Sequence, residues 1–196
     1  MKRVLLTTII ATCILTVSAS AVTRRVPGEY PRIQAAIQAC SDGDTVLVSP
    51  GVYYETINFL GKNITVTGTD PNDPKVVGYT ILNAEEDGSV VTFENGETRA
   101  AVLTGFTLTG GFGTLNAQFT GGEPIFWGAG IYCFQSSPTI TKNVIARNYG
   151  PAELDNPQQP RLGYGGAIAC IEGNPLVTYN TLRDNRAYAG AGLMTY

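Results

Sequence analysis

The side chains best suited to chemistry fall in two stretches of the chain, residues 112–127 and residues 149–164. Each stretch combines charged side chains with aromatic rings, whose flat faces can stack on the apolar side of a sugar ring. The aromatic candidates are Phe112, Phe119, Phe126, Trp127, Tyr149 and Tyr164. The charged candidates are Glu123, Glu153, Asp155 and Arg161. The set predicts a surface that binds carbohydrate; the alternative is that the rings pack on one another and shield the core.

The sequence shows no catalytic motif and no metal site. The chain has no His, which excludes Ser-His-Asp and Cys-His nucleophile systems and His-ligated zinc. The acids at 85–87, Asp70 and Asp73 lie among Gly, Asn and Pro, so we expect them to be solvated turn residues. No cofactor is therefore predicted, and calcium, which carboxylate clusters bind, has no specific support.

An internal repeat must position the two stretches. Residues 128–133, Gly-Ala-Gly-Ile-Tyr-Cys, match residues 165–170, Gly-Gly-Ala-Ile-Ala-Cys, at an offset of 37. A third copy opens at Gly190, so the basic unit has about 25 residues and the first copy carries an insertion of about 12. The offset of 37 also relates the two aromatic stretches, which we therefore expect to leave the same corner of neighbouring copies and to lie together.

The period within each copy indicates the fold. Apolar residues alternate with others, as in a β-strand, and Gly, Asn and Pro lie between the short strands, where turns need them. Such strands bury a face only when they are stacked coil upon coil. We predict an all-β fold: a right-handed parallel β-helix solenoid with a short N-terminal capping α-helix. A leucine-rich repeat is the competing solenoid, but Asn143 stands where its signature needs Leu.

Stacking predicts columns of like residues in neighbouring coils. The aliphatic column is Ile131, Ile168 and Leu193, the thiol column is Cys133 and Cys170, and the amide ladders pair Asn143 with Asn180 and Asn148 with Asn185. We expect the thiols to be buried and free. Two Cys residues side by side in a parallel stack point their Cα–Cβ bonds in the same direction, so their Cβ atoms stay about 4.8 Å apart, the spacing of the strands. A disulfide needs Cβ atoms about 3.5–4.5 Å apart.

The chain divides into three predicted segments. Residues 1–21 combine two basic residues, an apolar run and an Ala-x-Ala site, which predicts a signal peptide and a secreted protein, extracellular or periplasmic. The apolar run is too short for a stable membrane span. Residues 22–44 are predicted to form a cap with an amphipathic helix over Pro31–Cys40, followed by a strand at 45–48 and a turn at Pro50-Gly51. Residues 45–196 are the coils, and we expect further coils beyond them.

A family resemblance supports this fold. The segments Val26–Ile37, Gly43–Glu55 and Lys62–Val66, together with the later Gly-rich repeats, resemble the right-handed β-helix proteins of the pectin-lyase-like superfamily. The resemblance implies the fold from about Val26 to Tyr196. It implies no single activity, because the superfamily includes lyases, hydrolases, esterases, epimerases and proteins without known catalysis.

These features predict a secreted β-helix repeat module that binds a polysaccharide or a cell-surface glycan through the aromatic stretches. Two alternatives stay open. The chain is the N-terminal part of a polysaccharide lyase or hydrolase that acts on acidic polysaccharide, or it is a structural spacer without a ligand. Nucleic acid is not an expected partner, since the net charge is −3 and no basic run occurs.

Overall fold

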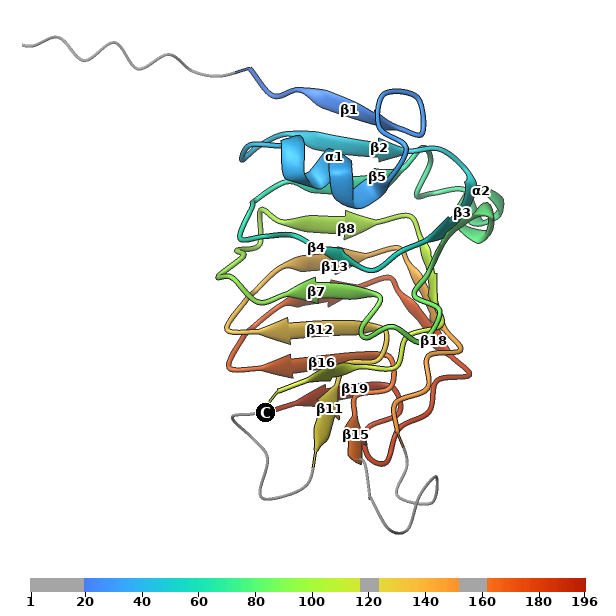
Figure 1. The fold of residues 1–196 in the computed structure, drawn as a ribbon, viewed down its shortest axis with the longest axis vertical. Helices are drawn as coiled ribbons and strands as arrows, with labels where there is room; N and C mark the ends of the chain where they lie inside the picture. The colour runs from blue at the N-terminus through green and yellow to red at the C-terminus, as the bar shows by residue number, and fades with distance from the viewer. Residues whose placement is uncertain (1–19, 117–123, 152–161) are drawn as a thin grey trace, which may run out of the picture.

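The structure is a computed structural model that describes residues 20–116, 124–151 and 162–196. Within these residues the regular secondary structure is mostly β-strand, with two short helices (Figure 1). Among the described strands, every pair is parallel except β10 with β11. The predicted all-β class with parallel sheets is confirmed, and the stacked arrangement is consistent with a β-helix.

Three sheets hold most of the strands. The first contains β1 (Thr23–Val26), β2 (Thr45–Val48), β5 (Thr65–Gly68), β8 (Val102–Thr104), β13 (Thr139–Thr141) and β17 (Leu176–Thr178). The second contains β3 (Gly51–Tyr54), β6 (Thr80–Asn83), β9 (Thr107–Thr109), β14 (Val144–Ala146) and β18 (Thr181–Arg183). The third, here called the front sheet, contains β4 (Ile57–Asn58), β7 (Val91–Phe93), β12 (Ile131–Phe134), β16 (Ile168–Ile171) and β19 (Leu193–Thr195).

From β2 onward, consecutive strands of these three sheets belong to different sheets, so each described coil contributes one strand to each of them. The coil of β12, β13 and β14 lies on the coil of β16, β17 and β18, strand against strand. The apolar side chains that point inward form one continuous core along the stack. Parallel strands buried in this way satisfy their backbone groups only through the coils above and below.

The predicted columns are present. Ile131 is paired with Ile168 and Ile168 with Leu193, and Cys133 is paired with Cys170. Both thiols are buried and free, and so is Cys40. The offsets of 37 and 25 residues therefore relate equivalent positions of successive coils, and they differ because one coil carries the longer loop.

The amide ladders are also present, at two corners of the coils that contain β13–β14 and β17–β18. Asn143 Nδ2 donates to Asn180 Oδ1 at 3.1 Å, and Asn148 is joined to Asn185 in the same way. A residue with positive φ precedes each of these Asn residues: Lys142, Arg147, Tyr179 and Asp184. The left-handed residue turns the chain, and the Asn amide then bonds the backbone of the preceding coil, as Asn180 Nδ2 does in donating to Ile140 O at 2.8 Å.

Helix α1 spans Ile33–Ala39, inside the predicted range of Pro31–Cys40, with Ile33 and Ile37 buried. No side chain at its first residues caps it. Instead Glu55, distant in the sequence, accepts hydrogen bonds from the backbone N–H groups of Ile33 and Gln34 at 2.8 and 3.0 Å. The carboxylate bonds donors that the helix itself leaves unpaired.

Two local features differ from the prediction. Strand β3 begins at Gly51, so the chain bends at Pro50 and is already extended at the next residue. Helix α2 (Pro74–Tyr79) was not predicted, although its start carries a recognisable signal. Asp73 accepts a hydrogen bond from Lys75 N at 2.8 Å, and Pro occupies the first turn. Among the described residues, neither helix is long and apolar enough to cross a membrane.

Candidate functional site

A small sheet joins the two aromatic stretches, as the repeat offset predicts. Strand β10 (Thr114–Leu115) pairs antiparallel with β11 (Ile125–Trp127), which pairs in parallel with β15 (Leu162–Tyr164). Trp127 is thereby opposite Tyr164, one coil further along. Figure 1 shows β11 and β15 at the lower end of the front sheet.

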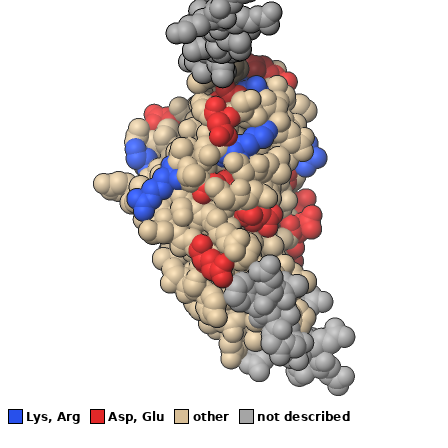
Figure 2. All heavy atoms as spheres, turned by 90° about the vertical axis from the view of Figure 1, so that its left-hand side faces the viewer, with Lys and Arg blue, Asp and Glu red and all other residues tan. Residues whose placement is uncertain are grey.

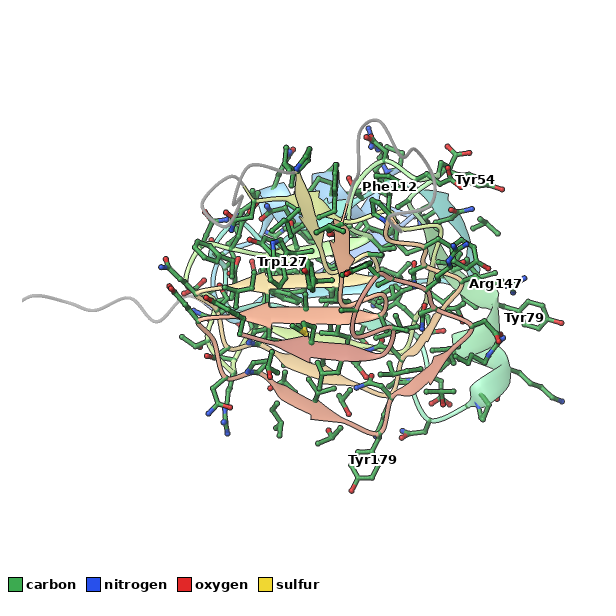
Figure 3. All side chains as sticks on the ribbon, turned by 90° about the horizontal axis from the view of Figure 1, so that it is seen from below. Tyr54, Tyr79, Phe112, Trp127, Arg147 and Tyr179 are labelled. Carbon is green, nitrogen blue, oxygen red and sulfur yellow. The ribbon has the colours of Figure 1, made fainter. Side chains whose placement is uncertain are left out.

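The small sheet covers part of the outer face of the front sheet. Side chains of β12 and β16 that point away from the core, Tyr132, Ala169 and Ile171, form a second buried cluster with Trp127. In Figure 3 the side chain of Trp127, the last residue of β11, lies over the stacked strands, whereas the side chains of Tyr79 and Tyr179 project outward. The chain therefore places an apolar layer on the outside of its coil at this position.

An aromatic hollow of about 220 Å³ lies at the edge of this layer, lined by Ile125, Trp127, Tyr164, Met194 and Tyr196. The rings of Trp127 and Tyr164 are stacked with centroids 4.9 Å apart, and the ring of Tyr196 lies 6.3 Å from that of Trp127. The ring of Tyr188 contacts that of Tyr164 edge to face, with centroids 6.1 Å apart. Strands β11 and β15 thus hold the Trp127 and Tyr164 rings against each other, and aromatic pairs of this geometry are stabilising.

The predicted aromatic residues do not all expose their rings. Trp127 is only 4% exposed, which corrects the expectation of an open indole face: the layer of the small sheet buries it. Phe112 and Phe126 contact each other edge to face at 5.3 Å, away from the hollow. Tyr149 is 47% exposed. Both ideas raised by the sequence, mutual packing and an accessible ring surface, therefore apply to different members of the set.

Several predicted site residues lie outside the described part of the chain: Phe119, Glu123, Glu153, Asp155 and Arg161. The described lining of the hollow also includes three residues that the sequence analysis missed, Ile125, Met194 and Tyr196. The third copy of the repeat was the signal that could have found Met194 and Tyr196. Stacking Leu193 on Ile168 puts Met194 on the outward side, beside Ala169.

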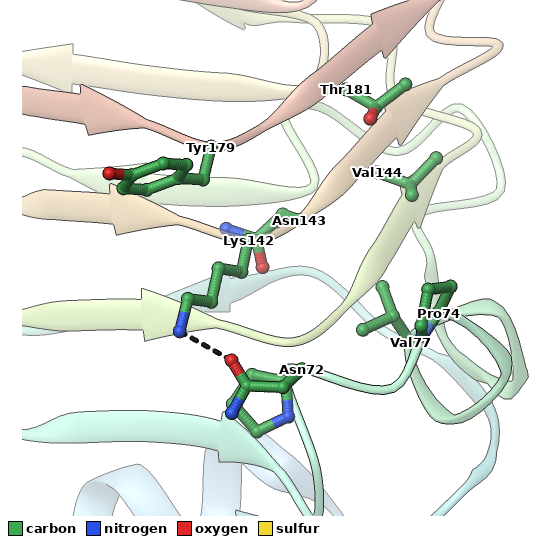
Figure 4. A pocket seen from close by; sticks show the side chains of 9 residues that line it. Asn72, Pro74, Val77, Lys142, Asn143, Val144, Tyr179 and Thr181 are labelled. Atoms are coloured by element: carbon green, nitrogen blue, oxygen red, sulfur yellow. Dashed lines mark hydrogen bonds between the residues drawn. The ribbon is translucent and has the colours of Figure 1, made fainter.

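A second hollow, of about 330 Å³, lies under helix α2 at a corner of the coils (Figure 4). Lys142 Nζ donates to Asn72 Oδ1 across it at 2.7 Å. The only aromatic side chain among the described residues that line it is Tyr179, which is 84% exposed. It has no pair of fixed rings, so it is less suited to a sugar than the aromatic hollow.

The buried acids have structural partners. Glu97 accepts hydrogen bonds from Gly61 N, Asn95 N and Ser136 Oγ at 2.8–3.0 Å. The acids at 85–87 and Asp70 are exposed, as predicted. Within the described residues no group of three or more His, Cys, Asp or Glu could hold a metal ion.

The stacked thiols lie in the apolar interior. Burial raises the pKa of the Cys133 thiol well above its ordinary value, with the neighbouring Cys170 contributing. Cys133 is therefore protonated at neutral pH and packs as a small apolar side chain.

The chain was compared with known proteins. No protein family matches it, and neither a curated protein nor a solved structure matches it. The geometry of the site is therefore the basis for the functional argument that follows.

Proposed function

We propose that this chain is an exported carbohydrate-binding module built on a right-handed parallel β-helix of the pectin-lyase-like type. The aromatic hollow at Trp127, Tyr164 and Tyr196 carries the proposal. The ligand is a polysaccharide or a cell-surface glycan, and one of its sugar rings lies in this hollow.

The fold assignment is supported by the path of the chain through three parallel sheets. Parallel crossover connections are right-handed in nearly all proteins, which favours that hand here. Helix α1 buries Ile33 and Ile37 against the first coils, as a capping element would. Export is supported by the N-terminal sequence: Lys2 and Arg3, an apolar run, and Ala19-Ser20-Ala21.

The chemistry of the hollow supports a sugar ligand. The exposed ring of Tyr196 and the half-buried ring of Tyr164 offer flat apolar surfaces, which the buried Trp127 supports from beneath, and Met194 and Ile125 extend the apolar area. A sugar ring has one face of C–H groups, which gains from such contact, while its hydroxyls stay at the rim in water. Because the Trp127 and Tyr164 rings are already stacked, binding orders few side chains and loses little entropy.

The test uses Tyr196→Ala rather than a change at Trp127. Tyr196 is 71% exposed, so truncating its ring leaves the fold intact, whereas the buried Trp127 supports the whole layer. The matched control is Tyr54→Ala, 62% exposed on β3, a strand of the second sheet. We expect wild type and Tyr54→Ala to bind the same polysaccharides on a glycan array and in affinity electrophoresis.

Tyr196→Ala should lose about two- to tenfold in affinity, the value of one aromatic contact. Circular dichroism of all three proteins should be the same. Absence of binding by the wild type would contradict the proposal, and so would equal binding by Tyr196→Ala.

A further inference from the structure

A polar hollow lies on the same outer face of the front sheet. It has a volume of about 340 Å³, and its lining is rich in amides and hydroxyls: Gln34, Asn58, Ser89, Thr92 and Thr114. Asn58 belongs to β4 and Thr92 to β7, where the two residues are paired. Donors and acceptors of this kind are the groups that bond sugar hydroxyls.

One outward row of residues connects the polar hollow with the aromatic hollow. It runs through paired positions of five strands: Asn58, Thr92, Tyr132, Ala169 and Met194. With strands about 4.8 Å apart, the row is about 19 Å long. The first two residues line the polar hollow, and the last lines the aromatic hollow.

The small sheet separates the two hollows and belongs to both. Thr114 of β10 lines the polar hollow and bonds Ser89 Oγ through its own Oγ1 at 2.8 Å. Its paired residue in β11 is Trp127, which lines the aromatic hollow. A chain of sugars that crosses the small sheet would therefore meet rings at one side and hydroxyls and amides at the other.

The charge of both hollows is neutral or negative. Among the described residues that line them there is no Lys or Arg, and the polar hollow contains the exposed carboxylate of Asp87. Asn58 Nδ2 also donates to Glu94 Oε1 at 2.7 Å, which places a second carboxylate beside it. On the adjoining side of the molecule, the Lys and Arg side chains in view lie in the upper half and not beside the lower coils (Figure 2).

We infer that the polar hollow is a second sugar subsite and that the ligand is a neutral polysaccharide, not a polyuronate. This inference rests on the proposed function, since it extends the same site. A uronate carboxylate placed here would face the carboxylates of Asp87 and Glu94, and the described residues that line the hollow include no Lys or Arg to balance its charge. Like charges at an interface select against a partner. Neutral sugars need only the hydroxyls and amides that the hollow supplies.

The test compares binding of the wild type to galactomannan, arabinoxylan and polygalacturonate in affinity electrophoresis. We expect retardation by a neutral polysaccharide and none by polygalacturonate. Thr92→Val removes one hydroxyl at nearly constant shape and should weaken neutral binding about two- to tenfold. Thr65→Val, a half-buried threonine on β5 of the first sheet, is the control and should have no effect.

Charge is tested separately with Asp87→Lys. This change should create binding to polygalacturonate, whereas Glu29→Lys, an equal change of charge at the exposed residue Glu29 beside β1, should not. If polygalacturonate binds the wild type and Tyr196→Ala weakens that binding, the neutral class is wrong while the proposed function stands. If Thr92→Val binds like the wild type, the polar subsite is wrong. If none of the three polysaccharides binds, the inferred neutral polysaccharide ligand is wrong, whereas the proposed function is decided separately by the glycan array.

Discussion

Asn148 Nδ2 donates a hydrogen bond to Asn185 Oδ1 at 3.1 Å, from one coil to the equivalent position of the next. The same amide accepts a hydrogen bond from Gly111 N at 2.9 Å and donates to Leu108 O at 3.1 Å in the preceding coil. One fully buried side chain therefore joins three coils at a corner, in addition to backbone bonds that cross there, such as Arg186 N to Asn148 O at 2.9 Å.

Replacing this amide should be costly. Asn148→Ala leaves the backbone N–H of Gly111 and the carbonyl of Leu108 without their partner in a buried position, and each such group costs about 1–3 kcal/mol. We expect the free energy of unfolding to fall by about 3 kcal/mol, measured by urea denaturation. The control is Asn174→Ala, an exposed Asn on the next coil, which should stay within about 0.5 kcal/mol of wild type. Equal effects of the two changes would mean that the ladder does not stabilise the stack.

Gly130 and Gly192 occupy the same position of different coils, but they should respond differently to a methyl group. A Cβ at Gly130 would lie 2.4 Å from Ala167 O and 2.7 Å from Ile145 Cγ2, because the next coil covers it. A Cβ at Gly192 would meet only Leu182 Cδ1, at 4.0 Å. We expect Gly130→Ala to lower the unfolding free energy by about 1–3 kcal/mol and Gly192→Ala to change it by less than about 0.5 kcal/mol. Thermal unfolding of both variants checks this, and a strong loss in Gly192→Ala would contradict it.

Arg147 has a φ of 56°, and the equivalent residue one coil earlier is Gly110, with a φ of 70°. A side chain in the left-handed region costs about 1–2 kcal/mol, which Gly avoids at the expense of a more flexible unfolded chain. Arg147→Gly should therefore be neutral or stabilising by up to about 1 kcal/mol. Arg183→Gly, within strand β18, should instead destabilise by about 0.5–1 kcal/mol. Chemical denaturation of the pair measures the difference, and a loss in Arg147→Gly as large as that in Arg183→Gly would exclude strain at this corner.

Much of the coil architecture could be predicted, because stacking forces equivalent residues to recur. The pairs Ile131–Ile168 and Asn143–Asn180 appear in the sequence at the same offset at which they lie in the structure. Each coil repeats the environment of the preceding coil, so the same residue type is required at equivalent positions and recurs in the sequence. The repeat also brought the two aromatic stretches together, since Trp127 and Tyr164 differ by that offset.

The parts that occur only once were harder to predict. The backbone N–H of Ile33, at the start of helix α1, donates to the Glu55 carboxylate. This contact joins residues that are distant in the sequence, so no local pattern predicts it. The burial of Trp127 depends on a layer formed outside the repeat, where the small sheet covers Tyr132. The polar hollow likewise combines Gln34, Asn58 and Thr114 from three separate segments. These features depend on tertiary contacts between distant segments, whereas the coils follow from the periodic pattern of the sequence.

Asp44 should make the N-terminal end of the molecule sensitive to acid. Its carboxylate accepts hydrogen bonds from the backbone N–H groups of Ser41 and Val22 and lies 2.6 Å from Arg24 Nη1. These bonds to the backbone, with Arg24 adding to them, lower the pKa of Asp44 to about 2. The folded state binds this proton more weakly than the unfolded chain, where an Asp titrates near 3.9. Its stabilisation is therefore complete above about pH 4 and is lost as the pH falls toward 2.

The variant Asp44→Asn removes the charge at every pH. We expect its melting temperature to lie below that of wild type at pH 6, and the gap to close between about pH 4 and pH 2 as the wild-type carboxylate becomes protonated. Asp87→Asn is the control, because among the described residues Asp87 has no ion pair and its side chain no hydrogen bond; it should follow wild type across the range. A gap for Asp44→Asn that stays constant down to pH 2 would show that the charge of Asp44 does not stabilise the fold, and that the lost packing of the side chain accounts for the difference.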